Sequence, residues 1–213
     1  LELERPLEPV MAGATTGAGV SGNSPGKFIQ LHNTYIVVET PEGLLILDQH
    51  ALHERIIYQE LLDRVTMGPL EGQRLLLPEI LPVTPRQQAA LEVVQPLLAD
   101  LGMEVAPFDG QTIAVHTFPS LLSKVVPHEF LRELLDKILE MGPRISREEL
   151  LHEVLDMASC KAAVKAGYPL SQDEIAALLA RREETERASN CPHGRPTTLR
   201  MTIYDLERQF KRK

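Results

Sequence analysis

The side chains in this chain that could hold a metal ion are concentrated in three short segments far apart in the sequence. The first is Asp48-Gln49-His50-Ala51-Leu52-His53-Glu54, which follows an apolar run. The others are Ser159-Cys160-Lys161 and Cys191-Pro192-His193-Gly194-Arg195-Pro196, and they contain both cysteines. Carboxylate, imidazole and thiolate groups together can bind divalent transition metals. The three segments can form one site only if the fold brings them together.

The first segment is placed where a strand should give way to a helix. His50 and Glu54 are four residues apart, so they share one face of that helix, and Asp48 precedes it. These three groups can therefore converge on one metal ion. Taken alone, the segment favours Asp48 as an N-cap, with His50 and Glu54 at the solvated surface, because short motifs often match by chance.

The two cysteine segments also have simple structural interpretations. Cys160 lies among small residues of an expected helix, where core packing is the alternative to metal binding. Cys191 and His193 are two residues apart in a Pro- and Gly-rich loop, where both can face one ion. The alternative there is a buried cysteine beside a loop histidine. The chain has no Cys-x-x-Cys pair, so a classical structural zinc module is not expected.

Positive charge is present near these segments although the chain as a whole is acidic. Arg195, Lys161 and Arg212 could hold a phosphodiester, or could be solvated surface charges. The net charge of -8 argues against a stand-alone nucleic-acid-binding protein, which usually carries a basic excess. A protein of this charge that acts on DNA must be brought there by something else.

Composition places the chain among ordinary globular proteins. Its 213 residues, 43% of them apolar and 24% charged, are enough for a sizeable core. Two cysteines do not make a disulfide framework, which suits a reducing, cytoplasmic compartment. We expect no membrane partner, because no apolar stretch approaches the roughly 20 residues needed to span a bilayer. No signal peptide is visible at the N-terminus.

The pattern of apolar residues predicts an α+β fold with an inserted module. Residues 1–26 are rich in Gly, Ala, Ser and Pro and are typical of a flexible linker. A three-stranded meander is expected next, at residues 28–32, 35–39 and 44–47, followed by a helix over 50–65. The inserted module should hold strands at 74–81, 103–108 and 112–118 and helices at 85–101 and 128–141. Helical residues should return at 147–167, in two pieces, and at 171–187, before a strand at 198–203 and a helix at 204–210.

Local signals mark several boundaries of these elements. Thr84 is expected to be the N-cap of the 85–101 helix, and Gly102 its C′ residue. Ser171 and Glu174 have the spacing of a capping box. The stretch Gln73-Arg74-Leu75-Leu76-Leu77-Pro78 is either an exposed apolar segment closed by a proline or a strand that enters the core.

Taken together, the segments resemble the C-terminal domain of the MutL family of DNA mismatch-repair proteins, in its endonuclease-bearing form. The family pattern Asp-Gln-His-Ala-x-x-Glu is matched at 48–54, Ala/Ser-Cys-Arg/Lys at 159–161, and Cys-Pro-His-Gly-Arg-Pro at 191–196. Its terminal Phe-x-Arg is matched by Phe210 and Arg212, and its Gln-x-Leu-Leu-x-Pro pattern by residues 73–78. Several separated matches in the same order are far more specific than any single one. The first family motif continues with four residues and a second Glu, which falls on Gln59 here, so Glu60 is only an alternative.

The resemblance implies a metal-dependent endonuclease that nicks one strand of duplex DNA. It implies Mn²⁺ for cleavage and Zn²⁺ as a regulatory or structural metal, held by Asp48, His50, Glu54, Cys160, Cys191 and His193. Asp48, His50, Glu54 and Arg195 are the expected catalytic residues, with Lys161, Phe210 and Arg212 in support. Gln73, Leu75, Leu76 and Pro78 are expected to bind the replication sliding clamp.

The resemblance also implies an assembly. The chain should form a homodimer, and within a full-length protein it should cooperate with a mismatch-recognition protein near the nucleoid. Residues 27–71 and 156–213 should form the dimerisation and metal-site subdomain, and residues 72–155 an inserted regulatory subdomain. Two rival functions remain: a non-catalytic dimerisation or scaffold domain with structural zinc, and a metallohydrolase of small phosphoesters.

Overall fold

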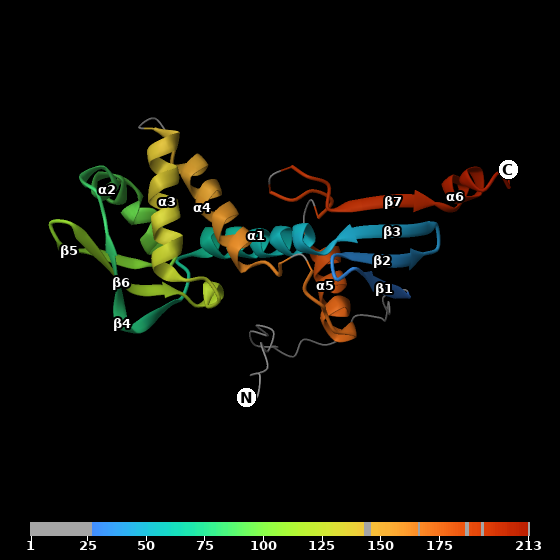
Figure 1. Ribbon diagram of the computed structural model, residues 1–213, viewed down its shortest axis with the longest axis horizontal. Coiled ribbons are helices and arrows are strands. Elements are labelled where there is room, and N and C mark those ends of the chain that lie inside the picture. The colour runs from blue at the N-terminus through green and yellow to red at the C-terminus, as the bar shows by residue number, and fades with distance from the viewer. Residues whose placement is uncertain (1–26, 143–145, 166, 186–187, 193, 213) are drawn as a thin grey trace.

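The computed structural model describes residues 27–142, 146–165, 167–185, 188–192 and 194–212. The expected linker at 1–26 therefore lies outside the described residues. The molecule is elongated, with a four-stranded sheet at one end and a three-stranded sheet at the other. Helix α1 (Gln49–Met67) runs between them (Figure 1). Helices and antiparallel sheets in one chain confirm the predicted α+β class.

The four-stranded sheet contains the predicted meander. Its order is β1-β2-β3-β7, and all its pairs are antiparallel. The strands are β1 (Phe28–Leu31), β2 (Tyr35–Thr40), β3 (Gly43–Asp48) and β7 (Thr198–Thr202). Because β7 pairs with β3, the C-terminal part of the chain returns beside the strand that leads into α1.

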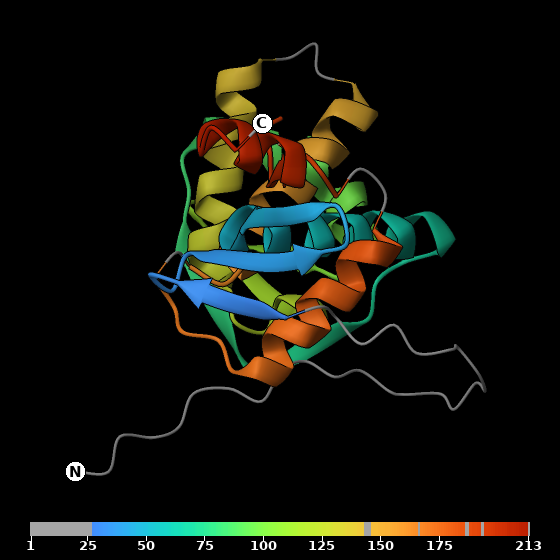
Figure 2. The same ribbon diagram turned by 90° about the vertical axis from the view of Figure 1, so that its right-hand side faces the viewer.

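One face of this sheet forms a small core with two helices. Side chains that alternate along β2 and β3 point inward and meet α1 and α5 (Gln172–Glu184). Figure 2 shows α5 lying beside the strands. The fully buried members of this core are Ile36, Leu47, Leu52, Ile56 and Ile175. Ser171 caps α5 in a capping box with Glu174, as the sequence predicts.

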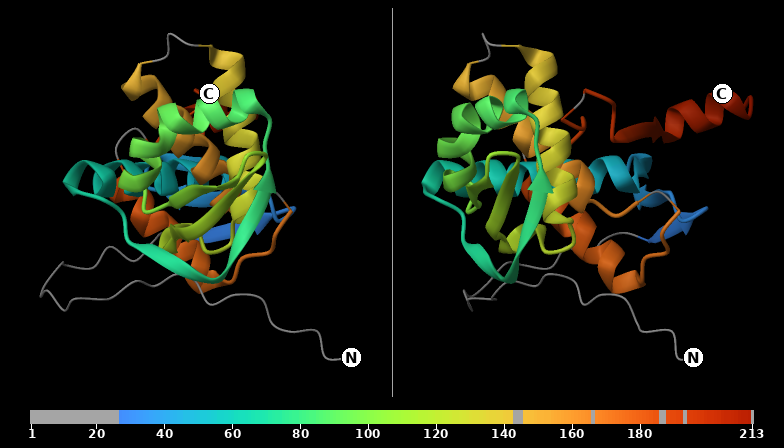
Figure 3. Two further views of the ribbon diagram at one scale, coloured as in Figure 1. Left: turned by 90° about the vertical axis from the view of Figure 1, so that its left-hand side faces the viewer. Right: turned by 60° about the vertical axis from the view of Figure 1, so that its left-hand side comes forward.

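A larger core surrounds the three-stranded sheet, whose order is β4-β6-β5. Its strands are β4 (Gly72–Pro82), β5 (Glu104–Asp109) and β6 (Thr112–Pro119). The helices around it are α2 (Pro85–Asp100), α3 (Pro127–Met141) and α4 (Arg147–Ala162), with a 3₁₀ turn at Ser120–Leu122. Figure 3 shows these helices packed beside the sheet.

Helix α1 belongs to both cores. Its 19 residues give it a length of about 28 Å. Leu52 and Ile56 in its first half are buried in the small core, whereas Tyr58 and Leu61 further along are buried in the large one. The predicted subdomain boundary near residue 72 coincides with the start of β4, and the one at residues 155 and 156 falls inside α4. The functional division stays a prediction.

The predicted second helical piece at 147–167 is wrong. Helix α4 is continuous to Ala162, and Ala163 then takes an extended conformation with ψ 147°. The reason is tertiary: the next residue, Val164, bonds through its main chain to two histidines of α1. Helix α5 also ends earlier than predicted, at Glu184, and residues 186–187 lie outside the described part of the chain.

The chain ends in α6 (Ile203–Gln209), which follows β7 directly. Its residues pack partly on β3, and none of them is buried. Among the described residues, no helix is both long and apolar enough to cross a membrane.

Candidate functional site

Asp48 joins the first and third segments of the sequence motif. Its Oδ1 accepts a hydrogen bond from the Ala51 amide at 3.0 Å, so it caps α1, as the structural alternative predicts. Its own amide donates to the Thr197 carbonyl at 2.9 Å. Residues 191–196 immediately precede Thr197, so the start of α1 and the cysteine loop lie side by side.

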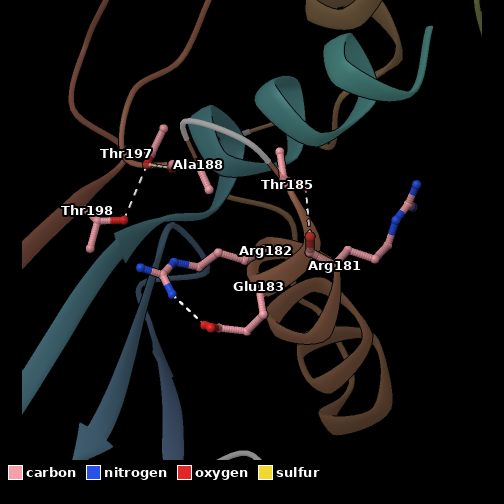
Figure 4. A network of polar contacts seen from close by, with 7 residues as sticks. All are labelled: Arg181, Arg182, Glu183, Thr185, Ala188, Thr197 and Thr198. Atoms are coloured by element: carbon pink, nitrogen blue, oxygen red, sulfur yellow. Dashed lines mark hydrogen bonds and ion pairs between the residues drawn. The ribbon is translucent and has the colours of Figure 1, made fainter. Parts of the chain in front are cut away.

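The cysteine loop is anchored by a buried threonine. Thr197 is 1% exposed, and its hydroxyl donates to the Ala188 carbonyl just after α5. Figure 4 shows this contact together with the neighbouring Thr198 hydroxyl, which lies 3.3 Å from that of Thr197. Thr185 closes the end of α5 by donating its hydroxyl to the Arg181 carbonyl at 2.7 Å. Thr197, at the end of the loop, is therefore tied to Ala188 on one side and to Asp48 on the other.

Within the loop, Cys191 is at the base of a tight turn. Its carbonyl accepts from the Gly194 amide at 2.9 Å, and its amide donates to the Arg195 carbonyl at 2.8 Å. Gly194 has φ +80°, a left-handed conformation that glycine adopts without strain. Cys191 is 4% exposed, whereas Arg195 is exposed. His193 lies outside the described residues.

His50 is held in a defined tautomer by the end of α4. Its Nδ1 lies 2.9 Å from the Val164 carbonyl oxygen, and a carbonyl can only accept, so Nδ1 carries the proton. In the neutral ring the Nε2 lone pair is then available to a ligand. This is the arrangement that metal-binding histidines typically have.

His53 bonds to the main-chain amide of Val164, the residue whose carbonyl bonds to His50. Its Nδ1 accepts from the Val164 amide at 3.1 Å, so two histidines three residues apart hold Val164 between them. Burial, and to a smaller extent the nearby Arg181, Lys124 and His50, together lower the pKa of His53 to about 4. His53 is therefore neutral near pH 7 and acts as an acceptor.

Glu54 and Cys160 bring the first and second segments together. Glu54 is 4% exposed, so the expectation of a solvated surface residue is wrong for it. Cys160 is exposed, so the core-packing alternative is wrong, because α4 buries its Ala158 and Ser159 side instead. Partial burial raises the pKa of the Cys160 thiol, and the Glu54 carboxylate raises it further. Arg195 and Lys161 act in the opposite direction. Arg195 of the cysteine loop therefore acts electrostatically on the Glu54–Cys160 pair.

Gln49 is a structural residue of the site for which the sequence motifs predicted no role. It is fully buried, and its Nε2 donates to the Tyr168 carbonyl at 3.0 Å. Its Oε1 accepts from Gln30 Nε2 at 2.5 Å, and the Gln30 amide group also bonds to Tyr168 and Leu170. These amides hold the α4–α5 connection against β1 and α1. No sequence signal singles it out, because it stands between two other polar residues, Asp48 and His50.

The other residues named from the first two motifs each make a polar contact of their own. Gln59 bonds along α1 to Arg55 and Asp63, and Glu60 forms an ion pair with Arg181 of α5. Lys161 pairs with Glu133 of α3 at 2.8 Å.

The Phe-x-Arg segment is not at this centre within one chain. Residues Phe210 and Arg212 follow α6, which begins beside Gly43, at the opposite end of β3 from Asp48. Those strand ends are about 17 Å apart at the usual rise per residue. Phe210 is 73% exposed.

The structure therefore gathers part of the predicted ligand set. Asp48, His50 and Glu54 lie within two turns of α1, Cys160 reaches Glu54 from α4, and the Cys191 loop is bonded to Asp48. Among the described residues, which exclude His193, no group of three His, Cys, Asp or Glu side chains is close enough to hold a metal ion.

The predicted clamp-binding segment lies on β4, away from this centre. Arg74 pairs with Thr117 and Glu79 pairs with Val115, so residues 75–78 are set against a single residue of β6. Leu76 is 98% and Leu77 78% exposed. The segment projects from the sheet, and the alternative of a strand entering the core is wrong for these two leucines.

Comparison with known proteins agrees with these motifs. The family described as "MutL C terminal dimerisation domain" matches residues 28–170, which is more than half of the chain. The chain belongs to this MutL family. A DNA mismatch repair protein MutL from Syntrophobacter fumaroxidans is 42% identical over 183 residues, which are 86% of this chain and 27% of that relative.

Other MutL relatives align over a similar share. The proteins of Symbiobacterium thermophilum and Caulobacter vibrioides are 38% and 35% identical, each over 86% of this chain and 29% of the relative. The chain thus spans less than a third of the length of these mismatch-repair proteins. Its membership of a family described as a dimerisation domain supports homodimer formation.

Proposed function

We propose that this MutL domain is a metal-dependent endonuclease that nicks one strand of duplex DNA during mismatch repair. The observation that carries the proposal is the Glu54–Cys160 pair, in which partial burial and then a buried carboxylate of α1 raise the pKa of a thiol of α4 within the field of Arg195. A core would not need an acid, a thiol and an arginine from three separate segments at one place. At a metal centre that cleaves a phosphodiester, acid and thiol groups can hold the metal and an arginine can bind the phosphate.

The available donors fit a transition metal. Acid and imidazole oxygens and nitrogens from Asp48, His50 and Glu54 suit Mn²⁺, and the thiols of Cys160 and Cys191 with His193 suit Zn²⁺. The proton on His50 Nδ1 leaves Nε2 for such a ligand. When bound, the metals would polarise the phosphodiester and activate water. Arg195 is exposed beside the pair and would hold the phosphate.

The homodimer would form through the outer face of the four-stranded sheet. Ile29, Val37, Ile46 and Leu199 are in register across all four strands, so their side chains make one apolar row. Ile29 is 56% and Leu199 60% exposed. A row of this kind is complementary to itself, and a two-fold axis would pair it with the same row of a second copy.

Other partners would bring the enzyme to DNA. Non-specific DNA affinity comes mainly from phosphate contacts, and a chain of net charge -8 supplies few of them. The replication sliding clamp would bind the projecting residues 73–78, and a mismatch-recognition protein would act through the rest of a full-length protein. This predicts weak cleavage by the chain alone and stronger cleavage when the clamp is present.

The test is nicking of supercoiled plasmid by the chain with Mn²⁺ and a DNA sliding clamp. Asp48→Asn should keep the cap of α1, because Asn caps as well as Asp, and should lose nicking. Asp63→Asn, on an exposed part of the same helix, is the matched control and should nick like the wild type. Equal nicking by the wild type and Asp48→Asn would contradict the proposal.

A second candidate is a dimerisation and scaffold domain with structural zinc. The burial of Cys191 and its place at the base of the loop favour it. It predicts bound zinc without nicking, and loss of fold or dimer in Cys191→Ser. Zinc content and nicking of the wild-type chain, together with thermal unfolding of Cys191→Ser, distinguish the two candidates.

A further inference from the structure

The projecting residues 75–78 of β4 are held at their C-terminal end by Glu79, the residue that follows them. Strand β4 leaves β6 after Arg74 and rejoins it at Glu79, so residues 75–78 form a large bulge. Leu75 packs against the large core, but Leu76 and Leu77 are exposed, so packing fixes only the first residue of the bulge. Another interaction must oppose the tendency of this stretch to adopt many conformations.

Glu79 supplies that interaction by bonding to the beginning of α3. Its Oε2 accepts from His128 Nδ1 at 2.6 Å and from the His128 amide at 3.1 Å. Val126 at the N-cap makes no side-chain cap bond, and Pro127 has no amide hydrogen. The Glu79 carboxylate is therefore the cap of α3, and its charge lies at the positive end of the helix. The bulge and the helix start are fixed to each other.

We propose that Glu79 and His128 form a clasp that pre-organises residues 75–78 for the sliding clamp. This rests on the proposed clamp binding by that segment. A partner that accepts Leu76 and Leu77 in an apolar cleft binds only molecules in which both side chains project. Its apparent dissociation constant rises as the fraction of such molecules falls. By reciprocity, clamp binding also stabilises the start of α3.

The experiment measures binding of the chain to a purified bacterial DNA sliding clamp by surface plasmon resonance. Glu79→Ala removes both bonds of the clasp and should weaken binding about tenfold, equivalent to about 1.4 kcal/mol. His128→Ala keeps the amide bond and should have an intermediate effect. Asp109→Ala is the matched control: it is an acid at the far end of the same sheet, and it accepts from the Gln111 amide.

A synthetic peptide of residues 72–80 distinguishes a failure of the clasp from a failure of clamp recognition. The peptide has no clasp, so it should bind more weakly than the chain, and Glu79→Ala should leave its affinity unchanged. Circular dichroism of each variant reports whether the fold is kept. If Glu79→Ala and the wild-type chain bind equally while Leu76→Ala does not bind, the clasp is refuted. If neither the chain nor the peptide binds, clamp recognition itself is refuted, and the clasp with it.

Discussion

Shortening one side chain on the outer face of the four-stranded sheet should weaken the dimer by a calculable amount. Leu199 is 60% exposed in the single chain. Full burial of a leucine side chain is worth about 1.5–3 kcal/mol, so covering its exposed part should contribute about 1–2 kcal/mol. Leu199→Ala removes most of that. A two-fold interface contains the residue twice, so the dimer should lose about 2 kcal/mol, or about 30-fold in dissociation constant.

Sedimentation equilibrium over a range of protein concentrations measures that constant directly. Met67→Ala is the control, because Met67 is 81% exposed at the other end of α1. It should leave the dissociation constant unchanged. Thermal unfolding of Leu199→Ala checks that β7 is intact. If Leu199→Ala dimerises as tightly as the wild type while Met67→Ala does not, the interface lies elsewhere and the reasoning is refuted.

Three further predictions concern the site. Gln49→Leu leaves the Tyr168 carbonyl without its buried donor and should lower the free energy of unfolding by about 2 kcal/mol. Urea denaturation measures this, and an unchanged midpoint would contradict the prediction. His53 has a folded-state pKa of about 4 and an ordinary value of 6.5, so the unfolded chain takes up an extra proton between these values. Its stabilising effect is full above pH 6.5 and is lost as pH falls towards 4. In metal-free buffer, His53→Asn should reduce this acid-induced loss in the free energy of unfolding by up to about 3 kcal/mol. Identical pH profiles for the variant and the wild type would exclude this. Glu54→Gln should lower the pKa of Cys160 and speed its alkylation by iodoacetamide at fixed pH. An unchanged rate would show that the Glu54 carboxylate does not act on the Cys160 thiol.

Local signals in the sequence predicted much of the fold. Thr84 caps α2 in a capping box with Gln87, and Gly102 beyond the helix has φ +74°. Such signals need only neighbouring residues. The end of α4 could not be predicted in this way, because Ala163 leaves the helix where His50 and His53, more than 100 residues earlier, bind the next residue.

The site shows the same division between local and tertiary information. The spacing of His50 and Glu54 predicted a shared helix face, but only the fold shows that Glu54 is buried and that Cys160 approaches it. Gln49 had no pattern of its own, since its role comes from carbonyl and amide groups of distant residues.

The most direct measurement of the central claim is anomalous scattering from crystals of the chain soaked in Zn²⁺ or Mn²⁺. Our account predicts a peak between Glu54 of α1 and Cys160 of α4, within reach of the loop that starts at Cys191. The peak should disappear in crystals of Glu54→Gln. Ions bound only elsewhere on the molecule, with this region free of anomalous signal, would contradict the account.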